Sequence, residues 1–101
     1  MAASPKLTYE NNCLAQLQAA VARLDRWRES VHHFTPGQRV DAERALDCLR
    51  GLCNRVLARL EDVRRADGDS WEMFKARADQ ALRQLIEALD RYQMAEAPQV
   101  A

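Results

Sequence analysis

At residues 35–38 the sequence reads TPGQ, and at residues 66–72 it reads ADGDSWE; these two stretches interrupt an otherwise continuous helical pattern. In the first stretch, Thr35 suits a helix N-cap because its hydroxyl can accept a hydrogen bond from an orphan backbone N–H, and Pro36 suits the first helical position. Gln38 can complete a capping box by reaching back to the Thr35 amide. One helix therefore ends at this stretch and a second helix begins.

The stretch at residues 66–72 combines a stop signal with a start signal. Gly68 can adopt the left-handed conformation that closes a helix, and Asp69 can cap the next helix with Glu72 as its reciprocal partner. We predict helices at about Thr8–His33, Pro36–Ala66 and Ser70–Ala95, in a single domain 1–101 with frayed ends at 1–6 and 97–101.

Each predicted helix carries apolar residues at spacings of three and four. We expect the first helix to bury Leu14, Leu17, Val21, Leu24, Arg28 and Val31, with a second row of Cys13, Ala20, Trp27 and Phe34 beside them. The core residues that we predict on the other two helices are Leu46, Leu49, Val56, Leu60, Trp71, Phe74, Leu85 and Leu89. All three stripes are wide enough for two partners, which predicts an all-α, antiparallel three-helix bundle with coiled-coil packing. The alternative is a helical hairpin that buries its remaining face in a dimer.

Composition supports helices and excludes several function classes. The 101 residues include 17 Ala and 12 Leu but only nine Ile, Val and Thr together, which favours helix over sheet. Fifteen basic and fifteen acidic residues cancel, so no global charge attracts nucleic acid or acidic lipid. No apolar run approaches the roughly 20 residues that cross a bilayer. Thirteen arginines against two lysines are typical of a GC-rich genome and indicate a bacterial source.

Three cysteines, an odd number, argue against a disulfide framework, and no apolar stretch follows Met1 as a signal peptide would require. We therefore expect a cytoplasmic protein. Antiparallel pairing would place Cys13 about one turn from Cys53, so a redox link between them is conceivable, although bridge geometry is strict. Cys48 lies nearer the solvent-exposed face, and we expect it to be the most reactive of the three thiols.

The sequence carries no recognised catalytic or metal-binding motif. It has no glycine-rich phosphate loop, no His-Glu-x-x-His and no Cys-x-x-Cys. His32 and His33 are adjacent, so on a helix they point about 100° apart and cannot chelate one metal. We expect no catalytic, cofactor-binding or metal-ligating residues and no small-molecule substrate.

The positions of four arginines on the predicted helices suggest specific interactions. Arg50, Arg55 and Arg59 occupy a stretch without an intervening acid, which could form a surface that binds phosphate groups. The zero net charge and the lack of interleaved aromatic residues favour an ordinary solvated face, and make nucleic acid an unfavoured partner. Arg28, on the expected seam, would need an acidic partner; the candidates are Glu43, Asp47 and Asp90.

The stretch ADGDSWEMFK at residues 66–75, followed by Ala78, Ala81, Leu85 and Ala88, resembles a recurrent segment of small bacterial coiled-coil proteins of about this length. The residues 14–27 resemble the first helix of those proteins only in their heptads and their Trp. The family is largely uncharacterised, and some members carry stress-response labels. The resemblance implies no activity and no catalytic residues, and this chain departs from it in the Pro36 turn and in its Arg and Cys content.

These observations predict a non-enzymatic helical interaction or scaffold protein that acts through its coiled-coil surfaces. The expected partner is a second copy of the chain, giving a homo-oligomer, or another protein. A peripheral membrane or lipid-binding bundle is the first alternative, ranked second because acids border the apolar stripes as often as bases. A weak nucleic-acid binder that uses the arginines of the second helix is the other alternative.

Overall fold

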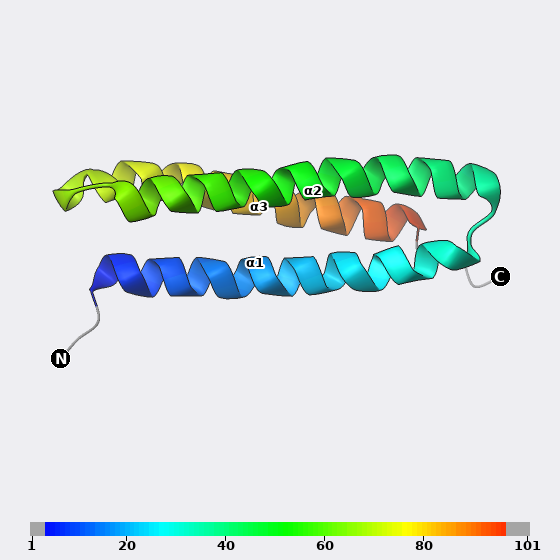
Figure 1. Ribbon diagram of the computed structural model, residues 1–101, viewed down its shortest axis with the longest axis horizontal. Coiled ribbons are helices and arrows are strands. Elements are labelled where there is room, and N and C mark those ends of the chain that lie inside the picture. Colours follow the sequence, from blue (N-terminus) through cyan, green and yellow to red (C-terminus); the bar gives the residue numbers. More distant parts are fainter. Residues whose placement is uncertain (1–3, 97–101) are drawn as a thin grey trace.

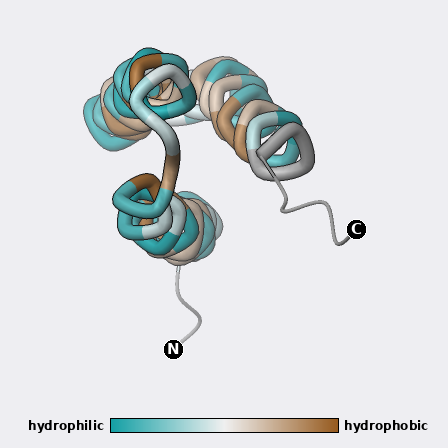
Figure 2. The backbone as a smooth tube through the Cα atoms, turned by 90° about the vertical axis from the view of Figure 1, so that its right-hand side faces the viewer, coloured by the Kyte–Doolittle hydropathy of each residue, from teal (hydrophilic) through white to brown (hydrophobic). Residues whose placement is uncertain are grey.

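The computed structural model describes residues 4–96, and every regular element within them is helical. Helix α1 spans Pro5–Ser30, α2 spans Pro36–Arg65 and α3 spans Trp71–Glu96, with 3₁₀ turns at Val31–His33 and Gly68–Ser70. The helices run antiparallel in sequence order, and α1 and α3 both pack on α2 (Figure 1). Seen end-on, the three helices occupy the corners of a triangle (Figure 2). The predicted all-α three-helix bundle is therefore confirmed.

Helix α1 begins three residues earlier than predicted. Ser4 is its N-cap: the Ser4 hydroxyl accepts a hydrogen bond from the Leu7 amide at 3.0 Å, and Pro5 fills the first helical position. This Ser-Pro pair repeats the chemistry of Thr35-Pro36, and residues 5 and 6, which the sequence predicts to be frayed, are part of α1. Residues 1–3 and the other predicted frayed end, 97–101, lie outside the described residues.

The turn between α1 and α2 contains the predicted capping box. The Gln38 amide donates to the Thr35 hydroxyl at 3.3 Å, and the Thr35 amide donates to the Gln38 side-chain oxygen at 3.1 Å. Phe34 before them is extended, with φ −84° and ψ 153°. The proline and the reciprocal cap thus set the start of α2 at the predicted residue.

The turn between α2 and α3 differs from the prediction. Gly68 is left-handed, with φ 56°, but α2 has already ended because Ala66 is extended, with ψ 136°. Asp69, the predicted cap of the third helix, lies inside the 3₁₀ turn, and Asp67 precedes this turn without a side-chain cap bond. Both the amide and the hydroxyl of Ser70 donate to the Asp67 carbonyl, at 3.2 Å and 2.6 Å, and this bonding sets a 3₁₀ turn before α3. Gly68 therefore shapes the turn without closing the helix.

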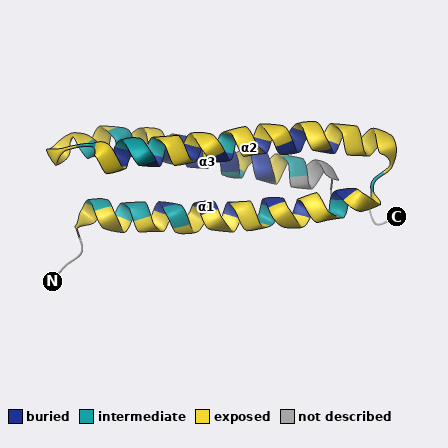
Figure 3. Ribbon diagram, in the orientation of Figure 1, coloured by how far each residue is buried: buried dark blue, intermediate teal, exposed yellow. Residues whose placement is uncertain are grey.

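The core is apolar and lies between the inner faces of the three helices (Figure 3). Six of the eight predicted core residues are buried: Leu46, Leu49, Val56, Leu60, Leu85 and Leu89. Trp71 and Phe74 are only half-buried. They stand in the first turn of α3, at the end of the bundle, where fewer neighbours cover a large ring.

The buried stripe of α1 is rotated from the predicted one. Its buried residues are Cys13, Leu17, Ala20, Leu24, Trp27 and Val31, at spacings of 4, 3, 4, 3 and 4. Val21 is 37% exposed, and Arg28, predicted on the seam, is exposed. This rotation buries the indole of Trp27 and keeps a guanidinium in water, and both choices lower the free energy. In the row that contains Leu14, Val21 and Arg28, Leu14 packs against the core and the other two residues are exposed.

Candidate interaction surfaces

A row of residues on α1 lies beside a row of residues on α2, and the two rows form one surface that the two helices share. On α1 this row is Leu7, Leu14, Val21 and Arg28, and on α2 it is Glu43, Arg50, Leu57 and Arg64; in each case the residues are seven apart and share a helix face. We call these eight residues the α1–α2 face. Leu7 and Leu57 are each 49% exposed, and Leu14 is half-buried. The bundle thus leaves apolar side chains of this face exposed.

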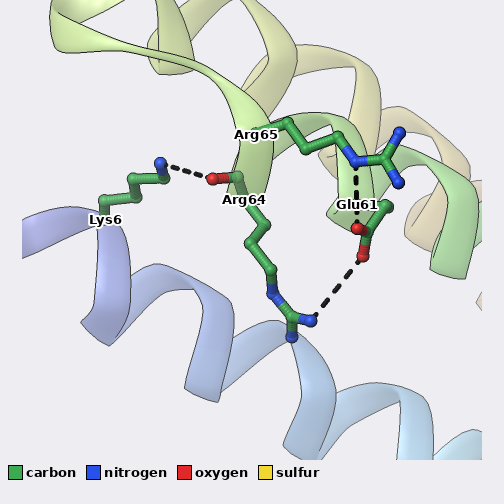
Figure 4. Close-up of polar contacts among 4 residues, drawn as sticks. All are labelled: Lys6, Glu61, Arg64 and Arg65. Carbon is green, nitrogen blue, oxygen red and sulfur yellow. Dashed lines mark hydrogen bonds and ion pairs between the residues drawn. The ribbon is translucent and has the colours of Figure 1, made fainter.

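One end of the α1–α2 face, near the second turn, has a shallow acidic depression of about 180 Å³. Its lining is Glu10, Leu14, Leu57, Leu60, Glu61 and Arg64. Glu61 accepts from Arg65 at 3.1 Å and pairs with Arg64 at 3.6 Å (Figure 4). The lining itself therefore carries one excess negative charge, which Arg65 offsets by its bond to Glu61 from outside the lining.

The other end of the α1–α2 face, near the first turn, has a larger and basic depression of about 420 Å³. Its lining is Arg28, Val31, His32, Arg39, Glu43, Leu46, Asp47 and Arg50. Glu43 and Asp47, two of the predicted partners of Arg28, share this depression with it. The third candidate, Asp90, instead pairs with Arg23 at 2.7 Å. Three arginines against two carboxylates give this end one excess positive charge.

The N-terminal turn of α1 is bonded directly to the C-terminus of α2. The Lys6 ammonium donates to the Arg64 carbonyl at 2.8 Å (Figure 4). It also donates to the Ala66 carbonyl at 2.8 Å. These carbonyls have no intrahelical donor, and a cation is favoured at the negative end of a helix. Sequence reasoning missed this contact because a residue 58 positions away supplies the donor.

Tyr9 joins α1 to α3 close to the same end. Its hydroxyl donates to the Asp79 carboxylate at 2.6 Å and lies 3.2 Å from the Lys75 carbonyl. Its ring lies 6.0 Å from that of Trp71, and the Lys75 ammonium lies 5.4 Å from the Tyr9 ring centroid. Burial, and then the bond to Asp79, raise the pKa of Tyr9. A neutral tyrosine therefore holds the ends of α1 and α3 together.

The cysteines do not form a redox pair in this structure. Cys13 and Cys53 are buried, Cys48 is exposed, and all three are free. Cys13 and Cys53 belong to the same apolar core, and no bond joins them. Burial also raises the pKa of both buried thiols, which disfavours the reactive thiolate.

The structure separates the three arginines that the sequence groups together. Arg50 lies 3.6 Å from Asp47 and lines the α1–α2 face. Arg55 and Arg59 line a depression between α2 and α3, because a spacing of five turns a side chain about 140° around the helix. Arg77 of α3 joins them there, and sequence reasoning missed it. The available signal was the polar row Arg77, Gln80 and Gln84 at spacings of three and four.

Within residues 4–96, no group of three or more His, Cys, Asp and Glu side chains is placed to hold a metal ion. None of the described helices combines the length and apolar character needed to traverse a bilayer. Comparison of the chain with protein-family models, with curated proteins and with solved structures finds no match.

Proposed function

We propose that this chain is a non-enzymatic helical interaction protein that pairs with a second copy of itself through the α1–α2 face. The observation that carries the proposal is the exposure of apolar side chains on the α1–α2 face: Leu7 and Val21 of α1 and Leu57 of α2 stay exposed. Exposed apolar side chains that gather on one face are typical of protein-binding sites.

The two depressions on the α1–α2 face favour a second copy as the occupant. The lining that contains Glu10 and Glu61 holds one more carboxylate than guanidinium, and the lining that contains Arg28 and Arg50 holds one more guanidinium than carboxylate. A two-fold axis across the middle of the face sets the first lining of one copy against the second lining of the other. Isologous contacts of this kind require a self-complementary surface, and the opposite charge excess of the two linings supports such a pairing.

Light scattering coupled to size exclusion tests the proposal. The wild-type chain is expected to elute as a dimer, and Leu57→Asp as a monomer, because the substitution would bury a carboxylate in the interface, beside Leu14. The matched control is Met73→Asp, since Met73 is 58% exposed on α3 and lies off this face. Circular dichroism checks that both variants stay helical. A monomeric wild type, or a dimer that survives Leu57→Asp, would refute the proposal.

A charge swap tests the two-fold arrangement separately. Arg28→Glu alone places like charges together and should weaken the dimer, and addition of Glu10→Arg should restore it. Restoration is expected because each change puts the opposite charge where its counterpart sits in the second copy. A double variant weaker than either single variant would show that these two ends do not meet.

A further inference from the structure

A second surface, away from the α1–α2 face, gathers positive charge without carboxylates in its lining. The depression between α2 and α3 measures about 420 Å³ and is lined by Arg55, Arg59, Arg77, Gln80, Ala81 and Gln84. Three arginines from two helices therefore line one depression, although the net charge of the chain is zero. We propose that this depression binds a compact dianion, a phosphate monoester or inorganic phosphate, through Arg55, Arg59 and Arg77.

The contacts of the three arginines leave them able to bind an anion. Arg59 is paired with Asp62 at 3.0 Å, and both side chains are more than a third exposed. Arg55 makes only a long contact of 3.4 Å to Gln84, and among the described residues no carboxylate lies within ion-pair distance of Arg55 or Arg77. With Asp62 counted, two positive charges remain, which matches a phosphate dianion.

The geometry of Arg77 favours a phosphate ligand. Its guanidinium carbon lies 5.8 Å from the Phe74 ring centroid, in a cation–π contact, and the residue is exposed, so a ligand can reach it. A planar guanidinium presents parallel N–H donors that match two phosphate oxygens. Gln80 and Gln84 add amide donors at the same place.

The position of Arg50 decides between a compact anion and a nucleic-acid strand. A strand needs cations spread along a track, but Arg50 is turned to the opposite side of α2 and lies beside Asp47. The remaining three arginines form a bounded cluster rather than a stripe. The structure therefore favours a small phosphorylated ligand over a polynucleotide.

A titration with sodium phosphate at constant ionic strength, followed by side-chain resonances in ¹⁵N NMR spectra, tests the site. Saturable shifts are expected at the guanidinium signals of Arg55, Arg59 and Arg77. The dissociation constant should rise about tenfold in Arg77→Gln, the loss of one charge-assisted hydrogen-bonded pair. Arg55→Lys keeps the charge but loses the fork, so a smaller weakening is expected. Arg50→Gln, which removes the same charge from the opposite side of α2, should bind phosphate like the wild type.

The results that overturn the proposal are equally specific. Shifts that never saturate, or an equal weakening in Arg50→Gln, would mean that phosphate responds only to overall charge. Chloride at the same ionic strength should produce no such shifts. Inorganic phosphate and glycerol phosphate are compared to distinguish a free ion from a monoester, and saturable binding of either supports the site. A short single-stranded oligothymidylate that binds more tightly than both, with a steep salt dependence that involves Arg50, would replace the proposal with nucleic-acid binding.

Discussion

The two ends of α1 are attached to the bundle by different physical means. The first turns are held by directional polar contacts: Lys6 binds carbonyls of α2, and Tyr9 binds Asp79 of α3. The last turns are held by burial, above all of Trp27, which is 7% exposed and whose indole N–H has no hydrogen-bond partner among the described residues. One helix is therefore positioned by directional hydrogen bonds at one end and by the burial of apolar side chains at the other.

Removal of Trp27 should have the largest effect on stability. Trp27→Ala is expected to cost about 3–5 kcal/mol of unfolding free energy, because it deletes a buried ring and leaves a cavity. Trp27→Phe keeps a ring and removes the unpaired N–H, so it should recover most of that loss. Urea denaturation followed by circular dichroism measures both. If Trp27→Ala lowered the unfolding free energy less than Tyr9→Phe does, the polar contacts of the first turns would hold α1 more firmly than the burial of Trp27.

Tyr9→Phe is expected to rank second, at about 1–2 kcal/mol. The substitution keeps the ring against Trp71 but removes the hydroxyl that donates to the Asp79 carboxylate at 2.6 Å. The same denaturation measurement applies. The double variant Tyr9→Phe with Asp79→Asn should cost little more than Tyr9→Phe alone, because both changes break one bond. Fully additive costs would show that the bond contributes nothing.

The pKa of Tyr9 predicts how the polar end responds to alkali. Burial and the bond to Asp79 raise that pKa above the usual value of about 10, so the folded state holds the phenolic proton more tightly than the unfolded chain. The stability that Tyr9 contributes is full below about pH 10 and is lost as the pH rises further. Denaturation at a series of pH values should show the stability of the wild type falling more steeply above pH 10 than that of Tyr9→Phe. Parallel curves would contradict the assignment.

The helix caps at the two ends should have smaller effects. Thr35→Ala is expected to cost about 1 kcal/mol because it breaks the reciprocal capping box. Ser4→Ala should cost less, since the first turn of α1 can fray without disturbing the core. Thermal unfolding of the two variants in parallel measures the difference. An equal or larger loss in Ser4→Ala would show that the first turn is as firmly coupled to the bundle as the Thr35 turn.

The smallest effect is expected for Lys6. Lys6→Met keeps a long side chain but removes the ammonium from the carbonyls of Arg64 and Ala66, at a cost of about 0.3–1 kcal/mol. Because the site is only half-buried and remains in contact with solvent, added salt should reduce this difference. Denaturation of the wild type and Lys6→Met at low and high salt tests it, and a cost that salt leaves unchanged would argue against an electrostatic cap.

The helices, the Thr35 cap and the buried face of α2 could be predicted because their signals are local. Leu49 and Val56 fall on a single apolar row, so the sequence leaves one choice of face. The buried face of α1 could not be predicted in the same way, because the row that contains Val21 and the row that contains Trp27 are both apolar. Packing against the other helices decides between them.

The polar contacts of the candidate surfaces were beyond local sequence reasoning. Tyr9 reaches a residue 70 positions away, and Arg77 meets Arg55 and Arg59 only because α2 and α3 pack side by side. The spacing of five residues already predicts that Arg50 and Arg55 point in different directions. Their partners on other helices can be identified only from the fold.

The two-fold contact is tested most directly by isotope-filtered NOE spectroscopy on a mixture of labelled and unlabelled chains. If copies pair through the α1–α2 face, methyl groups of Leu57 and Val21 in one copy should show intermolecular NOEs to apolar residues of that face in the other. Intermolecular NOEs that start instead from Met73 on α3, or none in a sample at dimer concentrations, would contradict the pairing.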